Sequence, residues 1–220
     1  MSIAANIGKI KQELSQNIKL IAVSKTKPVQ TIMEAYQAGQ KVFGENKVQE
    51  LVSKYNEMPK DIEWHLIGHL QTNKVKYIIP FVYLIHSVDS ENLLTEINKQ
   101  AAKLNKVQKV LLQISIDNED TKFGMEQQEL LIIIDNYLKG IFSNIEIIGL
   151  MGMATFTDSQ EQIANEFAGL KKLFDEIKSD YLTHQDTFNQ ISMGMSSDYK
   201  IAIANGSTMI RVGSHIFGSR

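Results

Sequence analysis

The sequence predicts an α/β fold, a single (β/α)8 TIM-type barrel with an extra N-terminal helix. Eight strand-like segments alternate with helix-like segments from end to end, which indicates βαβ units around a parallel sheet. Eight such units within 220 residues fit a closed barrel. No Gly-, Ser- or Pro-rich linker divides the chain, so residues 1–220 are expected to form one domain. An open doubly wound sheet is the main alternative.

The expected strands are short apolar runs that end on a polar or glycine-containing stretch. They lie at about 19–24, 41–44, 63–67, 82–86, 108–115, 145–150, 188–192 and 208–212. In a barrel all the carboxyl ends of the strands meet at one rim, where the active site lies. The polar stretches, including 117–122 after the fifth strand, are therefore expected to converge at that rim.

The expected helices are segments whose apolar residues recur every three or four positions. The N-terminal helix carries Ile3, Ile7, Ile10 and Leu14 on one face, and it would take the place of a helix missing after the last strand. The next helix has Pro28 in its first turn, where proline is favoured. The helices between the strands are expected at about 28–39, 45–57, 72–79, 90–104, 126–138, 160–178 and 196–205.

The composition excludes several classes of protein. A net charge of −2 argues against a general nucleic-acid binder, which would need a basic face. The absence of cysteine excludes disulfides, thiolate nucleophiles and Cys-based zinc sites, and it fits a reducing compartment, so we expect a cytoplasmic protein. The longest apolar run, 75–85, contains Lys76 and Pro80 and is too short to span a bilayer, so no membrane partner is expected.

Lys25 is the most informative residue, because it follows the apolar run 20–23 at the end of the first expected strand. A lysine is costly in a buried position, so one at this place is a candidate for amine chemistry such as Schiff-base formation. The alternative is a solvated lysine at a strand end. The functional interpretation therefore depends on whether Lys25 faces a pocket.

Two stretches are suited to a phosphate group. The stretch 193–197 runs from a strand into a helix, where Gly194 allows close backbone approach and the helix N-terminus would offer N–H groups. The stretch 211–214 ends the last strand, and Arg211 adds a fixed positive charge. Phosphate sites built from the loops after strands seven and eight recur in barrels.

An amine beside a phosphate site suggests a phosphorylated aldehyde held as a Schiff base on Lys25. Pyridoxal 5′-phosphate is the first candidate ligand. A phosphorylated sugar or keto acid, bound as in aldolases, would use the same groups and remains the alternative at this point.

Six segments, in order over about residues 20–218, make the chain resemble the pyridoxal phosphate homeostasis proteins, the YggS-like family. They are 22–28, 43–50, 64–74, 86–89, 192–196 and 206–214. One such segment is a weak signal, but six in this order are specific. The resemblance implies a fold-type III barrel like the N-terminal domain of alanine racemase.

The resemblance also implies a set of cofactor-binding residues. Lys25 would hold pyridoxal 5′-phosphate as a Schiff base. Ser196, Gly213 and Ser214 match positions near the phosphate, and Arg211 matches an arginine that faces the cofactor near its ring nitrogen or phosphate. The positions that the resemblance places along the pocket wall are Asn46 and Met193.

Other polar residues near the rim have simpler interpretations. His65, His69 and His86 match no compact zinc motif, and a structural hydrogen-bonding role is expected for at least two of them. Glu45 lies at the start of an expected helix, so we interpret it as part of a helix cap.

Two functions from different classes fit these residues: a carrier that buffers and delivers pyridoxal phosphate, and an amino-acid racemase. A racemase needs a base on each face of the substrate α-carbon, and Lys25 supplies one. The tyrosine that supplies the other in alanine racemases comes from a second domain, which is not expected here. We therefore expect a monomeric carrier without turnover of its own, with pyridoxal-phosphate-dependent apoenzymes as possible partners.

Overall fold

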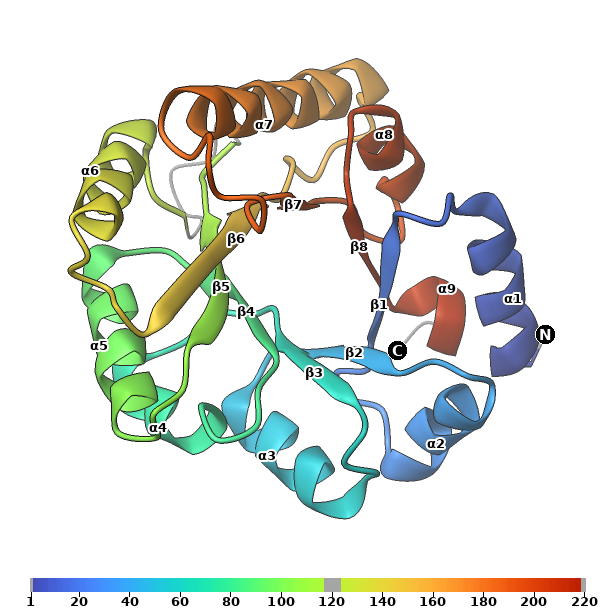
Figure 1. The fold of residues 1–220 in the computed structure, drawn as a ribbon. Helices are drawn as coiled ribbons and strands as arrows, with labels where there is room; N and C mark the ends of the chain where they lie inside the picture. Colours follow the sequence, from blue (N-terminus) through green and yellow to red (C-terminus); the bar gives the residue numbers. More distant parts are fainter. Residues whose placement is uncertain (1, 117–123, 219–220) are drawn as a thin grey trace.

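The computed structural model describes residues 2–116 and 124–218, and these form a closed barrel of parallel strands (Figure 1). Strands adjacent in the sequence are adjacent in the sheet, and the first pairs with the last to close the ring. The strands are β1 (Lys19–Val23), β2 (Val42–Glu45), β3 (Glu63–Leu66), β4 (Leu84–Val88), β5 (Gln108–Gln113), β6 (Ile145–Met151), β7 (Gln190–Ser192) and β8 (Met209–Val212). The predicted barrel is confirmed, and the open sheet is excluded. The polar stretch 117–122 lies outside the described residues.

The helices surround the barrel (Figure 1). They are α1 (Ile3–Glu13), α2 (Val29–Gln37), α3 (Val48–Glu57), the 3-10 helix η1 (Thr72–Lys74), α4 (Val75–Ile78), α5 (Glu91–Ala102), α6 (Gln127–Leu138), α7 (Gln160–Asp180), α8 (Tyr199–Ala204) and α9 (Ser214–Phe217). As predicted, α1 occupies the place in the ring between α8 and α2. The expectation that no helix follows the last strand was wrong, because α9 forms one turn there. The carbonyl oxygen of Ile216 in α9 accepts a hydrogen bond of 3.0 Å from Asn6 in α1.

Two helices begin later than the sequence predicts, and the residues before them become rim loops. Helix α3 begins at Val48 because Glu45 completes β2, so the interpretation of Glu45 as a helix cap was wrong. Helix α8 begins at Tyr199. Before it, the carboxylate of Asp198 accepts a hydrogen bond of 2.5 Å from the backbone N–H of Met195 and closes a turn.

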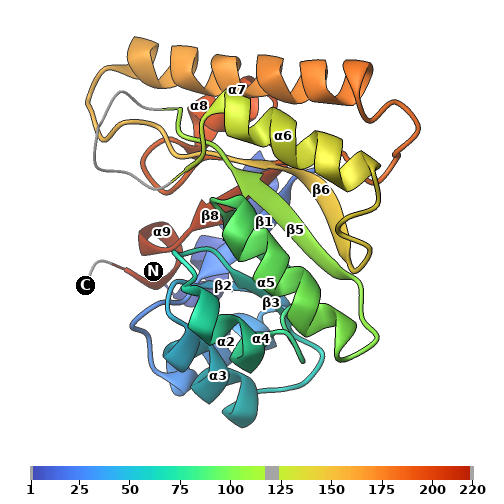
Figure 2. The same ribbon diagram turned by 90° about the vertical axis from the view of Figure 1, so that its left-hand side faces the viewer.

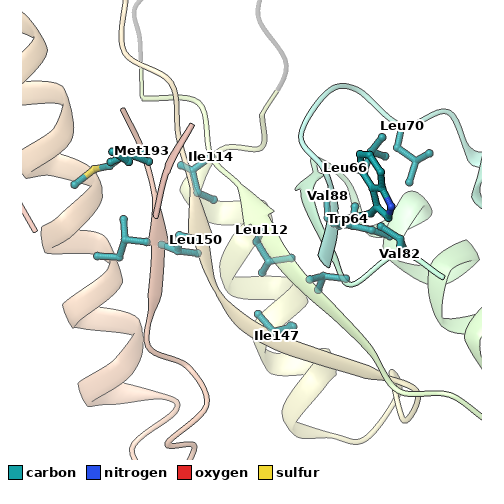
Figure 3. Packing of buried hydrophobic residues seen from close by; sticks show 14 of the residues in the cluster. Trp64, Leu66, Leu70, Val82, Val88, Leu112, Ile114, Ile147, Leu150 and Met193 are labelled. Atoms are coloured by element: carbon teal, nitrogen blue, oxygen red, sulfur yellow. The ribbon is translucent and has the colours of Figure 1, made fainter. Parts of the chain in front are cut away.

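The hydrophobic core has two layers, because successive side chains of each strand face opposite sides of the barrel wall. Leu20 and Ala22 of β1 belong to the large cluster between the barrel and the helices, part of which Figure 3 shows. Ile21, between them, faces the barrel interior. The residues of the interior cluster are Ile21, Leu84, Leu111, Ile148, Met151 and Met209.

The longest helix, α7, is amphipathic and lies along the outside of the barrel (Figure 2). The residues that it buries are Ile163, Phe167, Leu170, Phe174 and Ile177. None of the helices within residues 2–116 and 124–218 has both the length and the apolar character required to cross a membrane.

Substitution of Gly149 by alanine is expected to destabilise the protein, because an added Cβ would overlap the carbonyl oxygen of Gln190 on the adjacent strand. We expect the free energy of unfolding to fall by about 2 kcal/mol or more. Gly169→Ala is the matched control, since no atom lies within 4 Å of its added Cβ. Alanine is favoured over glycine in a helix by about 1 kcal/mol, so this variant gains stability. Urea denaturation compares the two, and equal stabilities would contradict the close contact between β6 and β7.

Candidate functional site

A cavity of about 390 Å³ lies at the carboxyl end of the barrel. Six of the seven residues predicted to bind the cofactor line it, namely Lys25, Asn46, Ser196, Arg211, Gly213 and Ser214. The other lining residues are Val23, Thr26, Lys27, Ile67, Met153, Phe156, Met195, Ser197 and Gly218. They follow strands β1, β2, β3, β6, β7 and β8, so the rim predicted from the strand ends is the place where the cavity forms.

Lys25 reaches the cavity because the side chains of β1 alternate between the two sides of the barrel wall. Ile21 faces the barrel interior and Val23 lines the cavity, so every second residue of the strand is directed inward. Lys25 continues this series in the turn after the strand and is half-buried. A lysine in this position lies at a protected site rather than on the open surface, which favours the functional interpretation of Lys25.

The two predicted phosphate stretches meet at the mouth of the barrel. The backbone N–H of Gly213 donates a hydrogen bond of 3.2 Å to Ser196 Oγ, which joins the loop after β8 to the loop after β7. The N–H of Arg211 also donates to the carbonyl oxygen of Gly194, at 2.9 Å. Gly194 has φ 94°, and a Cβ there would lie 2.6 Å from Ala202 Cβ, so the turn requires glycine.

The chemical character of these loops differs from the expectation in one respect. Helix α8 begins only at Tyr199, three residues after Ser196, so its N-terminus does not carry the anion-binding argument. The groups that face the cavity there are instead the side chains of Ser196, Ser197 and Ser214. Hydroxyl groups donate hydrogen bonds to phosphate oxygens as backbone N–H groups do.

Arg211 contributes a buried positive charge to the cavity wall. Its side chain is directed into the barrel, where Nη1 donates to Ser192 Oγ at 2.6 Å and Nη2 donates to the carbonyl oxygen of Gly152 at 3.1 Å. Burial lowers the pKa of Arg211 to about 10, while the nearby charge of Asp198 acts in the opposite direction. The guanidinium therefore remains charged at neutral pH, and neither of these hydrogen bonds neutralises it.

A chain of hydrogen bonds continues from Arg211 through the barrel interior. A guanidinium only donates, so Ser192 accepts from Arg211 and gives its own proton to His86 Nδ1, 2.9 Å away. His86 Nε2 then donates to His65 Nδ1 at 2.8 Å. This order assigns the remaining proton to His65 Nε2, which has no hydrogen-bond partner.

The hydrogen-bonding role predicted for the histidines is therefore confirmed for His65 and His86. Burial is the main cause that lowers the pKa of both, so both are neutral at neutral pH. His69 lies apart and contacts the carboxylate of Asp89 at 3.1 Å. Within residues 2–116 and 124–218, no group of histidine and carboxylate side chains has the arrangement of a metal site.

Met193 does not line the cavity. Its side chain is fully buried in the cluster between barrel and helices, where Figure 3 shows it with Ile114 and Leu150. Two other methionines, Met153 and Met195, line the cavity instead. A shift by two positions along the chain moves a side chain from the core to the rim, and the sequence pattern did not separate these methionines.

Phe156 was not predicted from the sequence and is the most exposed of the large apolar side chains in the described residues, at 92%. It lines the cavity mouth in the loop between β6 and α7. No motif or periodicity marks this loop, so nothing in the sequence indicates that it lines the cavity. Asn46 was predicted, and its Oδ1 is buried at the cavity without a hydrogen-bond partner.

The fold is a closed (β/α)8 barrel with a lysine after the first strand and an arginine and a serine at the end of the last. These features define a barrel of the class formed by the N-terminal domain of alanine racemase. In agreement, residues 1–220 match the family "Alanine racemase, N-terminal domain". Within that class, the chain belongs to the family of pyridoxal phosphate homeostasis proteins. The relative from Aquifex aeolicus with that name is 42% identical over 203 residues, which cover 92% of this chain and 87% of the relative.

Solved structures agree with this assignment. PipY of Synechococcus elongatus, in its form without pyridoxal phosphate, is 35% identical and has a TM-score of 0.92, covering 99% of this chain and all of PipY. The form of PipY with pyridoxal phosphate bound is 34% identical, with a TM-score of 0.88 over the same share of both chains.

The free energy of unfolding is expected to fall between pH 7 and pH 5. His65 and His86 have pKa values below their ordinary value of 6.5 in the folded protein, so below about pH 6.5 the unfolded chain binds more protons. Stability from this source is complete above pH 6.5 and is lost as the pH falls.

Urea denaturation at several pH values measures this dependence. His65→Gln keeps hydrogen-bonding atoms but does not titrate, so its pH dependence should be smaller than that of the wild type. His184→Gln, at an exposed position, is the control. Identical pH dependence in all three proteins would show that the buried imidazoles are not the cause.

Proposed function

We propose that this protein binds pyridoxal 5′-phosphate in the cavity and serves intracellular homeostasis of this cofactor, by buffering it and delivering it. The observation that carries the proposal is the charge of the cavity. Among its described lining residues three are basic, Lys25, Lys27 and Arg211, and none is acidic. Such a wall favours a phosphorylated ligand, and the amine of Lys25 suits the aldehyde of this one.

The residues present fit the cofactor. We propose that Lys25 Nζ condenses with the cofactor aldehyde to form a Schiff base and releases one molecule of water. The hydroxyls of Ser196 and Ser214, beside the close backbone at Gly213, suit the phosphate. The unpartnered Asn46 Oδ1 offers an acceptor that a bound ligand would satisfy.

Arg211 has a distinct part in this proposal. Its guanidinium is fixed by Ser192 and Gly152, so it presents a permanent charge at the cavity floor. A guanidinium beside the ring nitrogen or the phosphate would hold the cofactor without supplying or accepting a proton, because it does not lose its own near neutral pH. This property suits retention of a cofactor.

A carrier role is favoured over racemisation by the lining residues. A racemase needs a second base opposite Lys25. The described residues that line the cavity include no tyrosine, histidine, aspartate or glutamate. The other lysine there, Lys27, donates from Nζ to the carbonyl oxygens of Phe217 and Gly218, at 3.2 and 3.3 Å, so these contacts hold its amine at the C-terminal segment.

We further propose that the protein acts as a cytoplasmic monomer and that pyridoxal-phosphate-dependent apoenzymes receive the cofactor from it. The open position of the cavity at the barrel rim gives the cofactor a direct route out to an acceptor protein.

Lys25→Ala is expected to abolish covalent attachment of the cofactor. The wild-type protein, incubated with pyridoxal 5′-phosphate and reduced with borohydride, should gain one cofactor mass, and peptide mapping should place it on Lys25. Lys47→Ala, which removes an exposed lysine near the rim, should retain the adduct. An adduct of equal yield in Lys25→Ala would refute the assignment of Lys25.

No racemisation of alanine or serine is expected from the cofactor-loaded protein, because the second base is lacking among the described lining residues. Incubation with each L-amino acid, followed by chiral chromatography, checks this. Turnover that depends on the cofactor and disappears in Lys25→Ala would overturn the carrier proposal in favour of an enzyme.

A further inference from the structure

A largely buried ionic cluster, in which only the side chain of Glu50 is partly exposed, at 24%, lies directly behind the turn that carries Lys25. Its members are Glu45 at the end of β2 and Glu50 and Lys54 on α3. Lys54 is 5% exposed, and its Nζ donates to Glu45 Oε1 at 2.7 Å and to Glu50 Oε1 at 2.6 Å. None of the three lines the cavity, so the proposed binding of the cofactor does not use them directly.

The ionic cluster holds the chain on both sides of Lys25. On one side, the carbonyl oxygen of Ser24 accepts from Lys54 Nζ at 2.8 Å, and Ser24 Oγ donates to Glu45 Oε1 at 2.6 Å. On the other side, the backbone N–H of Thr26 donates to Glu50 Oε1 at 2.6 Å. The residue between these anchors is Lys25, so its backbone is fixed from both directions.

The turn needs such anchors because its backbone is strained. Thr26 has φ 66°, in the left-handed region, which is a rare conformation for a β-branched residue. Such a conformation costs about 1–3 kcal/mol and persists only where the surroundings enforce it. The short, charge-assisted hydrogen bond from Thr26 to the Glu50 carboxylate is an interaction of sufficient strength to do so.

The ionic cluster is poorly explained as a stabilising device alone. Buried ion pairs contribute little net stability, because desolvation offsets their attraction. Glu45 Oε2 is buried without a hydrogen-bond partner, and burial raises the pKa of Glu45. The ionic cluster does fix the conformation of the turn that carries Lys25, which would otherwise relax.

We propose that Glu45, Glu50 and Lys54 are positioning residues that hold the Lys25 turn in the conformation required for attachment of the cofactor. The inference rests on the proposed function of Lys25. The condensation forms one C=N bond and releases water, and its rate depends on how closely the amine is held to the bound aldehyde. Loss of an anchor lets the turn relax, and the attachment becomes slower.

Glu50→Ala is the most informative variant, because Lys54 keeps its bonds to Glu45 and to Ser24 while Thr26 loses its acceptor. Stopped-flow absorbance should show that covalent attachment of pyridoxal 5′-phosphate slows by about tenfold or more, as expected from the loss of one charge-assisted hydrogen bond. Glu50→Gln keeps a neutral acceptor for Thr26 and should slow the reaction less. Glu57→Ala, an exposed acid on the same helix, is the control and should match the wild type.

Two further measurements separate positioning from a general loss of structure. Pyridoxine 5′-phosphate, which has no aldehyde, should bind equally well to the wild type and to Glu50→Ala. The double variant Glu50→Ala/Thr26→Asn should recover part of the rate, because asparagine adopts positive φ more readily than threonine. Thermal unfolding checks that each variant is folded. If Glu50→Ala does not fold, the attachment rate of Glu50→Gln tests the positioning role instead.

Equal attachment rates in the wild type, both Glu50 variants and Glu57→Ala would overturn the positioning role. Equally weakened binding of pyridoxine 5′-phosphate would also overturn it, since the defect would then lie in the whole cavity. Failure of the wild type to form an adduct on Lys25 is a different result, because it refutes the proposed function and is measured before any variant.

Discussion

The pairing of β1 with β8 is the interaction on which the rest of the structure depends. It aligns Ile21 with Arg211 and Ala22 with Val212, and it closes the ring between the two ends of the described chain. Because both strands run in the same direction, the residues that follow them emerge together. Lys25 and Ser214 are far apart in the sequence, yet this one register places them on the wall of one cavity.

The barrel interior combines an apolar cluster with a chain of polar groups. Met209 of β8 packs in the interior apolar cluster, whereas Arg211, two residues further on, is charged and joins a hydrogen-bonded chain to His86. Burying these groups is costly unless each finds a partner. The cost is concentrated beneath the cavity and around the Lys25 turn, where geometry matters most for the proposed function.

The sequence predicted the residues that line the cavity well where the position of a residue relative to the strand end decides which way it faces. Lys25 and Arg211 have this property, because strand alternation and barrel closure fix the side of the wall that they face. The sequence predicted the location of a side chain poorly where the exact end of a strand and the length of the following loop determine it. Met193 lies in the core while Met195 lines the cavity, and Glu45 belongs to a strand rather than to a helix cap. Local propensity does not resolve such differences, because neighbouring elements set where a strand ends.

The sequence by itself determined the barrel and the rim that carries the site, because apolar periodicity marks the strands and their ends. The six predicted residues that line the cavity came from the polar stretches at those strand ends together with the resemblance to the family. Only the tertiary structure decided what holds the site in place. The ionic cluster behind Lys25 joins Ser24 to Lys54, 30 positions apart, and the interior chain joins His86 to Ser192, 106 positions apart. Contacts over such separations leave no periodic signal, since they depend on how the closed barrel brings its strands and helices together.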